Sequence, residues 1–313
     1  MSRRRWLDVL RGGFLAAVLG FAWWGVHGRG EELADVVRRT SPLGLAVAAG
    51  LVVAGLLVTS VAWLRLLAGY DHRLPPGEGR AVFFVGQLGK YIPGSVWSMG
   101  AHAGLARGFD VPARVTVGTS LTFLWLNLAT SGLVAGSFAL TGAWRPGADV
   151  PAWLVAAAVA GCVAGLTPYA VNRAGTAIGG PDGSLRLSLR GVGVLVGLMA
   201  LTWGCYAGAV LALAPRPSVA LFPVAAGAFT TAYAVGVLVV LAPAGVGARE
   251  VTLIALLAPV TGVTTATALA LLTRALHTGG DLLLALVSWA LARATRRDVA
   301  LSGPGVGGPC DRS

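Results

Sequence analysis

The sequence is poor in charge. Asp, Glu, Lys and Arg together make up 12% of the 313 residues, whereas a soluble domain carries about 25%. This shortage excludes an ordinary soluble enzyme or binding domain. Only one lysine, Lys90, is present beside 23 arginines. The arginine excess, with abundant alanine, glycine and valine, indicates the coding bias of a GC-rich bacterial genome, so the single lysine is the more informative residue.

Cysteine and catalytic motifs are also scarce. The three cysteines, Cys162, Cys205 and Cys310, are too few and too widely spaced for a metal site or a disulfide framework. The chain contains no CxxC, HExxH or Walker motif, and no Ser/His/Asp or Cys/His set is indicated. The sequence therefore predicts no metal, no cofactor and no catalytic residue. It favours a protein that is not an enzyme.

Apolar residues take the place of the missing charge. They make up 56% of the chain, and the uncharged runs 115–144, 150–172, 191–215 and 217–248 each exceed the roughly 20 residues that cross a bilayer as a helix. We therefore expect an all-α polytopic membrane protein with about seven to eight transmembrane helices. Residues 1–297 should form one transmembrane domain, and residues 298–313 a disordered cytoplasmic tail.

The arginines predict the orientation. Helices that cross the membrane are expected at 12–28, 42–64, 115–142, 151–172, 191–214 and 218–241, with a short interfacial helix at 29–41. In this topology 17 of the 24 basic residues fall on one side and five on the other. The positive-inside rule then predicts a protein of the cytoplasmic (inner) membrane with both termini in the cytoplasm. The net charge of +11 is explained by basic loops held against anionic lipid, so no nucleic acid partner is expected.

Residues 81–105 are predicted to form a broken helix. Lys90 divides this apolar stretch into pieces too short to span a bilayer, and Pro93 and Gly94 break the helix three residues later. Freed backbone groups and a charge at membrane depth must line a cavity. We expect two half-helices that re-enter the same face, because a complete crossing would move later loops across the membrane and spoil the arginine asymmetry.

A second break is predicted over residues 243–260. It contains Pro243, Gly245 and Gly247 and is followed by Arg249 and Glu250. Residues 251–273 and 275–291 should form a helical hairpin with Arg274 at its turn. A single span over 251–292 is the alternative.

Two interrupted helices, one in each half of the chain, indicate a transporter's binding site. Exposed helix N-termini attract anions, and Lys90 and Arg249 would add full positive charge. Together they predict a site for an anionic headgroup, most plausibly a phosphate. Glu250 is either a counter-charge or a proton-coupled group. The alternative for both cations is a side chain that reaches from a helix end to the membrane surface.

Arg274, His277 and Asp281 share one helix face at i, i+3 and i+7. An acid within the membrane is a candidate functional residue, which makes Asp281 part of the predicted site. A capped hairpin turn with a local ion pair would explain Arg274 and His277 equally well. A membrane-embedded transferase could use Asp281, Glu250 or His277 as a base, although no spacing here favours that.

The two breaks also carry a resemblance to a known family. The first reads Gly89-Lys90-Tyr91-Ile92-Pro93-Gly94-Ser95-Val96-Trp97, and the second reads Pro243-Ala244-Gly245-Val246-Gly247-Ala248-Arg249-Glu250. Both are similar to signatures of the flippase-like transmembrane region of the lysylphosphatidylglycerol synthases, and the resemblance extends over roughly 11–297. It implies a stand-alone member without the soluble aminoacyltransferase domain. It also adds Tyr91, Pro93, Gly94, Trp97, Gly245 and Gly247 to the expected substrate-binding residues.

Three functions remain open from the sequence. The leading hypothesis is translocation or binding of an anionic or polyprenyl-phosphate-linked lipid. The second is a membrane subunit or partner of a lipid-linked glycosyl- or aminoacyl-transferase. The third is an assembly or sensor protein that transports nothing. The lipid substrate, the energy coupling and the oligomeric state do not follow from the sequence.

Overall fold

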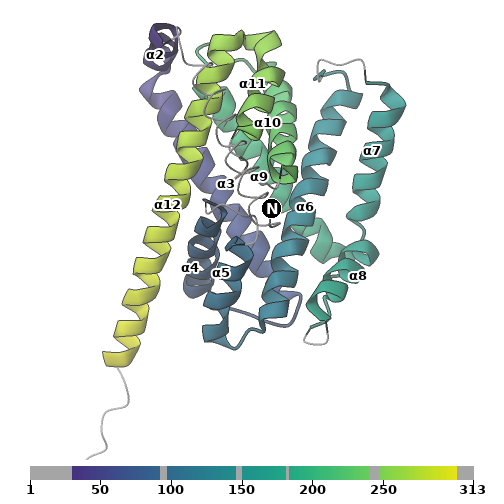
Figure 1. Cartoon of the computed structure of the whole chain (residues 1–313), viewed down its shortest axis with the longest axis vertical. Helices are drawn as coiled ribbons and strands as arrows, with labels where there is room; N and C mark the ends of the chain where they lie inside the picture. The colour runs from purple at the N-terminus through teal and green to yellow at the C-terminus, as the bar shows by residue number, and fades with distance from the viewer. Residues whose placement is uncertain are drawn as a thin grey trace, which may run out of the picture.

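The computed structural model describes residues 30–91, 97–145, 150–180, 183–239, 245 and 247–301, and these residues form helices and connections without a strand. The first predicted span, 12–28, lies outside the described residues. The long helices lie roughly along one axis (Figure 1). The helices are α2 (Gly30–Arg39), α3 (Pro42–Ala68), α4 (Pro76–Gln87), α5 (Trp97–Ala106), α6 (Ala113–Leu140), α7 (Ala152–Gly165), α8 (Pro168–Gly179), α9 (Leu189–Leu213), α10 (Leu221–Leu238), α11 (Ala248–Thr261) and α12 (Val263–Leu301), with short 3-10 turns η1 (Leu88–Tyr91) and η2 (Arg107–Phe109).

Five described helices, α3, α6, α9, α10 and α12, are long and apolar enough to cross a membrane. A sixth crossing results if α7 and α8, which are bent by 63° at their junction, form one span. The described part of the chain is thus an all-α structure compatible with an integral membrane protein. The predicted seven to eight crossings are not confirmed.

The span predicted over 151–172 is not straight. It breaks after Gly165 because Thr167 caps the next helix: its Oγ1 accepts the N–H of Ala170 at 3.3 Å, and Pro168 occupies the first helical position. The polar inner loop predicted from Arg173 onward is wrong in its first part, since α8 continues to Gly179. The Thr-Pro start signal was present in the sequence.

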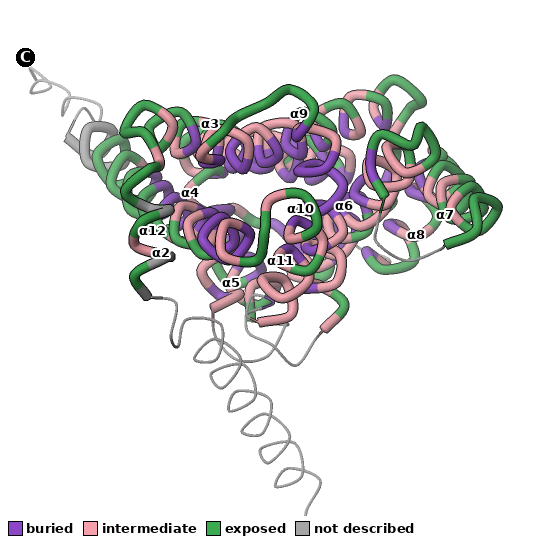
Figure 2. Tube along the Cα trace, turned by 90° about the horizontal axis from the view of Figure 1, so that it is seen from above, coloured by how far each residue is buried: buried purple, intermediate pink, exposed green. Residues whose placement is uncertain are grey.

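The core lies between α3, α6, α9 and α10. Figure 2 shows the buried residues on the facing sides of these helices, whereas α7 and much of α12 are exposed. Gly55 of α3 faces the ring of Tyr206 on α9, and an added Cβ there would lie 2.5 Å from that ring. Trp203 of α9 donates to Thr130 of α6 at 3.0 Å. The central helices therefore pack closely and hold the shorter ones in place.

The first break is a pair of short helices. α4 and α5 pack side by side (Figure 1), and their 12 and 10 residues give lengths of about 18 and 15 Å, half the thickness of a bilayer core. Buried His102 of α5 packs against the rings of Trp63 and Phe83 and contacts the Phe83 carbonyl at 3.0 Å. Two half-helices agree with the sequence prediction; Pro93 and Gly94 lie outside the described residues.

The second break separates α10 from α11. Gly245 adopts a positive φ of 67° and touches Gly236 of α10, where an added Cβ would lie 2.8 Å from the Gly236 carbonyl oxygen. Only glycine fits such a backbone at this distance. α11 then has 14 residues and is also too short to cross a bilayer.

The hairpin with its turn at Arg274 is wrong. Two helices do follow the break, but the turn is at Gly262, which has a positive φ of 81° and donates to the Ala258 carbonyl at 2.9 Å. α12 then continues for 39 residues through Arg274 to Leu301, four residues into the segment expected to form a tail. Its length is about 58 Å, and it contacts both α4 and α11.

Two helix pairs enter the bundle from opposite ends. α4 begins and α5 ends at the end where α3 ends and α6 begins, whereas α10 begins and α11 ends at the end where α12 begins (Figure 1). We call α4–η1–α5 the first hairpin and α10–α11 the second hairpin, and we call Leu88–Tyr91 and residues 247–250 the described parts of their tips.

Candidate functional site

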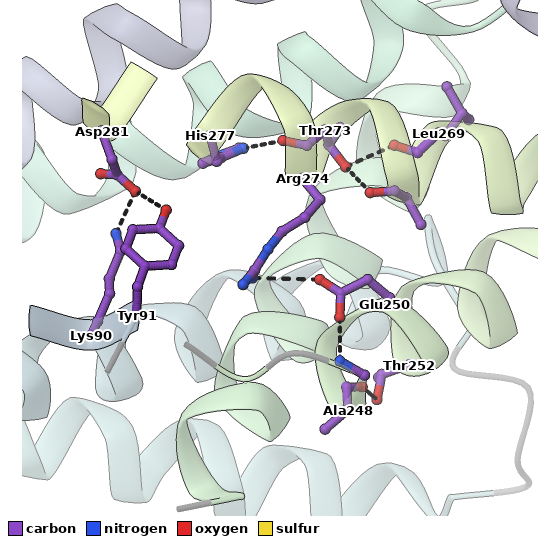
Figure 3. A network of polar contacts seen from close by, with 12 residues as sticks. Lys90, Tyr91, Ala248, Glu250, Thr252, Leu269, Thr273, Arg274, His277 and Asp281 are labelled. Carbon is purple, nitrogen blue, oxygen red and sulfur yellow. Dashed lines mark hydrogen bonds and ion pairs between the residues drawn. The ribbon is translucent and has the colours of Figure 1, made fainter. Parts of the chain in front are cut away.

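The tip of the first hairpin is attached to α12 through Asp281. Lys90 Nζ lies 2.6 Å from Asp281 Oδ2, and the Tyr91 hydroxyl donates to the same oxygen at 2.7 Å (Figure 3). The Asp281 side chain is 4% exposed and that of Lys90 is 32% exposed. Two strong donors on one oxygen compensate the loss of hydration of the carboxylate.

The tip of the second hairpin is attached to α12 through Glu250. Arg274 Nη1 lies 3.4 Å from Glu250 Oε1, and the backbone N–H of Gly247 donates to Glu250 Oε2 at 2.6 Å (Figure 3). Glu250 therefore caps the first turn of α11, where a negative charge is favourable. Of the two roles left open by the sequence, its contacts are those of a counter-charge.

Both attachments use one face of α12. Arg274 and Asp281 are seven residues apart, which is about 10.5 Å along a helix, and His277 lies between them (Figure 3). Arg274 pairs with Glu250 and Asp281 pairs with Lys90, so these two charged side chains of α12 bind different hairpins. The structure thus brings Lys90 and Glu250, 160 residues apart in the sequence, to the same face of α12.

Arg249 differs from the other two cations. Its guanidinium lies over the ring of Phe229 on α10, 4.6 Å from the ring centroid, and it forms no ion pair with a carboxylate among the described residues. Its neighbour Glu250 binds Arg274 instead, because adjacent helical residues point about 100° apart. A cation held against an aromatic ring in this way remains able to bind an anion.

His277 is buried and packs against Phe229, the ring that also lies against Arg249. Its ring packs against Tyr206 and Phe229, with centroid separations of 4.6 and 5.4 Å. Nδ1 contacts the Thr273 carbonyl at 2.7 Å, whereas buried Nε2 has no hydrogen-bond partner among the described residues. Phe229 therefore contacts both His277 and Arg249.

The described members of the remaining candidates lie beside the two tips. Trp97 begins α5 and is 53% exposed, and Gly245 is in contact with Gly236. Pro93 and Gly94 lie outside the described residues. Phe229 and Tyr206 were not predicted from the sequence. Nothing in the sequence distinguishes them from other aromatic residues of apolar helices.

The chemistry that this arrangement supports is anion binding. No group of three His, Cys, Asp or Glu side chains among the described residues could hold a metal ion. Three cationic side chains, Lys90, Arg249 and Arg274, come from three different elements, and two of them pair with the carboxylates of Asp281 and Glu250. Arg249 has no carboxylate partner among the described residues, so an anionic ligand could pair with it without breaking a described ion pair.

The fold and the site together define an α-helical protein with several helices able to cross a membrane and a polar cluster at the meeting point of two helical hairpins. In comparisons with known proteins, no family model matches the sequence and no curated protein matches it.

Proposed function

We propose that this protein binds the phosphate of an anionic or polyprenyl-phosphate-linked lipid at the hairpin tips and moves it between the leaflets of the cytoplasmic membrane. The observation that supports this proposal is Arg249, a cation at membrane depth without a described carboxylate partner, beside two cations that are already paired. A partly buried guanidinium held against an aromatic ring favours an anionic ligand, and a phosphate matches its planar pair of donors.

Lys90 is the cation that the ligand would recruit next. It is one-third exposed, while its partner Asp281 is buried. A phosphate bound at Arg249 would compete with Asp281 for Lys90, and the loss of that ion pair would release the first hairpin from α12. The competition links occupancy of the site to movement of the hairpin, which a translocation cycle requires.

The arginine distribution supports the orientation. Arg73, Arg107 and Arg190 lie in or beside connections at the end where the first hairpin begins and ends, and loops rich in arginine face the cytoplasm. That end is therefore proposed to be cytoplasmic, as are both termini. The resemblance of the two breaks to flippase-like signatures supports the same role for Tyr91, Pro93, Gly94, Trp97, Gly245 and Gly247.

Lipid movement in liposomes tests the proposal. The purified protein is reconstituted with fluorescent phosphatidylglycerol, phosphatidylcholine or a polyprenyl phosphate, and the fraction of lipid accessible to an impermeant quencher is followed over time. Wild-type protein should move at least one phosphate-bearing anionic lipid faster than phosphatidylcholine. Arg249→Ala should slow this by about tenfold or more, since a charged hydrogen bond contributes about 1.5–3 kcal/mol.

The matched control is Arg216→Ala, which removes an exposed arginine from the connection between α9 and α10. It should move lipid at the wild-type rate. The proposal is wrong if folded wild-type protein moves none of the anionic lipids, or if Arg249→Ala and Arg216→Ala move them equally fast.

A further inference from the structure

A second cationic site lies away from the hairpin tips. A groove of about 280 Å³ is formed where α3 ends and α4 begins. Three arginines border it and the remaining lining residues are apolar. Its lining residues are Val61, Leu64, Arg65, Ala68, Arg73, Leu74, Pro76 and Arg80. We call it the arginine groove.

No ion pair with a carboxylate of the described residues compensates the positive charge of the arginine groove. None of its three arginines forms an ion pair with another described residue. Asp71 and Glu78 belong to the same stretch of chain but do not line the groove. Three guanidinium groups around one small groove repel one another, and a shared anion relieves that repulsion.

The apolar wall indicates which anion. Val61 and Leu64 lie on α3, a helix able to cross a membrane, and Arg65 follows them near its end. The groove therefore extends from apolar helix surface to the cationic connection over a few residues. An anionic headgroup attached to an acyl chain fits both parts, whereas a free inorganic anion would leave the apolar wall exposed.

We propose that the arginine groove binds the phosphate of an anionic glycerophospholipid, with an acyl chain along Val61 and Leu64. This site is separate from the hairpin tips and does not depend on the function proposed for them. Arg65 belongs to α3, whereas Arg80 belongs to α4. A lipid held by both links the base of the first hairpin to α3, so the bound lipid should also raise the thermal stability of the protein.

Native mass spectrometry of the detergent-solubilised protein tests the site. Phosphatidylglycerol or phosphatidylcholine is titrated in, and the affinity of the first lipid bound is measured for the protein with a wild-type groove and for the triple variant Arg65→Gln, Arg73→Gln, Arg80→Gln. Both proteins, like the control variants, also carry Arg249→Ala, so that the site proposed at the hairpin tips does not contribute. The protein with a wild-type groove should prefer phosphatidylglycerol. The triple variant should bind it roughly 100-fold more weakly, because each basic residue near an anionic lipid contributes about 1 kcal/mol.

The matched control removes the same charge from exposed arginines that do not line the groove, Arg107→Gln, Arg114→Gln and Arg190→Gln. It should retain the wild-type affinity. A second variant, Ala68→Phe, fills the groove without changing its charge and should also lose the lipid. Inorganic phosphate at millimolar concentration should not displace the lipid.

Each opposite result overturns the proposal. Equal affinity of the groove triple variant and the control triple variant would show that the preference for phosphatidylglycerol depends on the overall positive charge of the protein and not on the groove. Wild-type affinity in Ala68→Phe would place the lipid elsewhere, and displacement by inorganic phosphate would show that the acyl chain contributes nothing.

Discussion

Asp281 is the residue on which the position of the first hairpin depends. One of its oxygens accepts from both Lys90 and Tyr91, and its side chain is almost completely buried. Removing one partner of such a pair leaves the other charge uncompensated, which costs more than the pair contributes net. Lys90 reaches solvent in part, which reduces that cost.

A double-mutant cycle measures this coupling. Asp281→Asn and Lys90→Met should each lower the free energy of unfolding by about 1–3 kcal/mol. The loss in the double variant should be smaller than the sum of the two single losses, by about 1 kcal/mol or more. The measurement is thermal unfolding in detergent.

The control for this cycle is the exposed pair Arg39–Asp35, which is joined at 2.7 Å with side chains 69% and 52% exposed. Its coupling energy should not exceed about 0.5 kcal/mol. Equal coupling in the two cycles would contradict a special role for Asp281.

At this scale the sequence predicted the charged residues but not their partners. Lys90, Arg249, Glu250 and Asp281 could be recognised because charge is costly at membrane depth. Which cation binds which carboxylate depends on how α12 passes the two tips. The role of Phe229 could not be predicted from the sequence, because aromatic side chains are common in apolar helices.

The hairpins, at the scale of elements, depend on glycines that allow close backbone approach. Gly89 lies at the tip of the first hairpin, where an added Cβ would be 2.7 Å from the Cα of Ser98. Gly245 combines a positive φ with contact to Gly236. In both cases the neighbour is backbone, which cannot move aside as a flexible side chain can.

Alanine substitution should therefore separate these glycines from others nearby. Gly89→Ala and Gly245→Ala should each lower the free energy of unfolding by about 1–3 kcal/mol. Gly100→Ala and Gly104→Ala, on α5 with open space around them, should raise it by up to about 1 kcal/mol.

Circular dichroism melts of the four purified variants measure these changes in stability. Similar stability of Gly89→Ala and Gly100→Ala would show that the tip of the first hairpin tolerates a side chain, contrary to the close approach of the two backbones.

The elements themselves were predictable where a start or stop signal was combined with length. The two halves of the first hairpin follow from the charge and the Pro-Gly pair. The sequence misplaces the turn after α11, because a charged residue such as Arg274 suggests the end of an apolar helix. Gly262 is the stronger indication of a helix end. Arg274 is tolerated inside α12 since Glu250 provides its counter-charge. That tertiary contact cannot be read from the local sequence.

For the whole molecule, α4 begins and α5 ends at the same end of the bundle (Figure 1), so we expect the connections on either side of α4–α5 to lie on the same side of a membrane. Single cysteines test this in a protein whose native cysteines, Cys162, Cys205 and Cys310, are replaced by alanine. Arg73→Cys and Arg107→Cys should react with an impermeant maleimide from the same side.

Ser218→Cys, in the connection between α9 and α10, should react from the other side. The measurement uses membrane vesicles of both orientations. Labelling of residues 73 and 107 from opposite sides would mean that the first hairpin is a complete crossing. The proposed cytoplasmic location of this end of the bundle would then be wrong as well.

The charge balance of the tips has an electrical consequence. Lys90, Arg249 and Arg274 against Asp281 and Glu250 leave a net charge of +1 among the described groups. In the proposed cycle, a phosphodiester with one negative charge would bring this cluster to zero, so movement of the loaded cluster would do no work against the membrane potential. The empty cluster would keep its charge, and a potential that is negative inside would draw it toward the cytoplasm with about 2.3 kcal/mol per 100 mV. Voltage would then act only on the return of the empty site, which would give the proposed cycle a direction without a coupling ion.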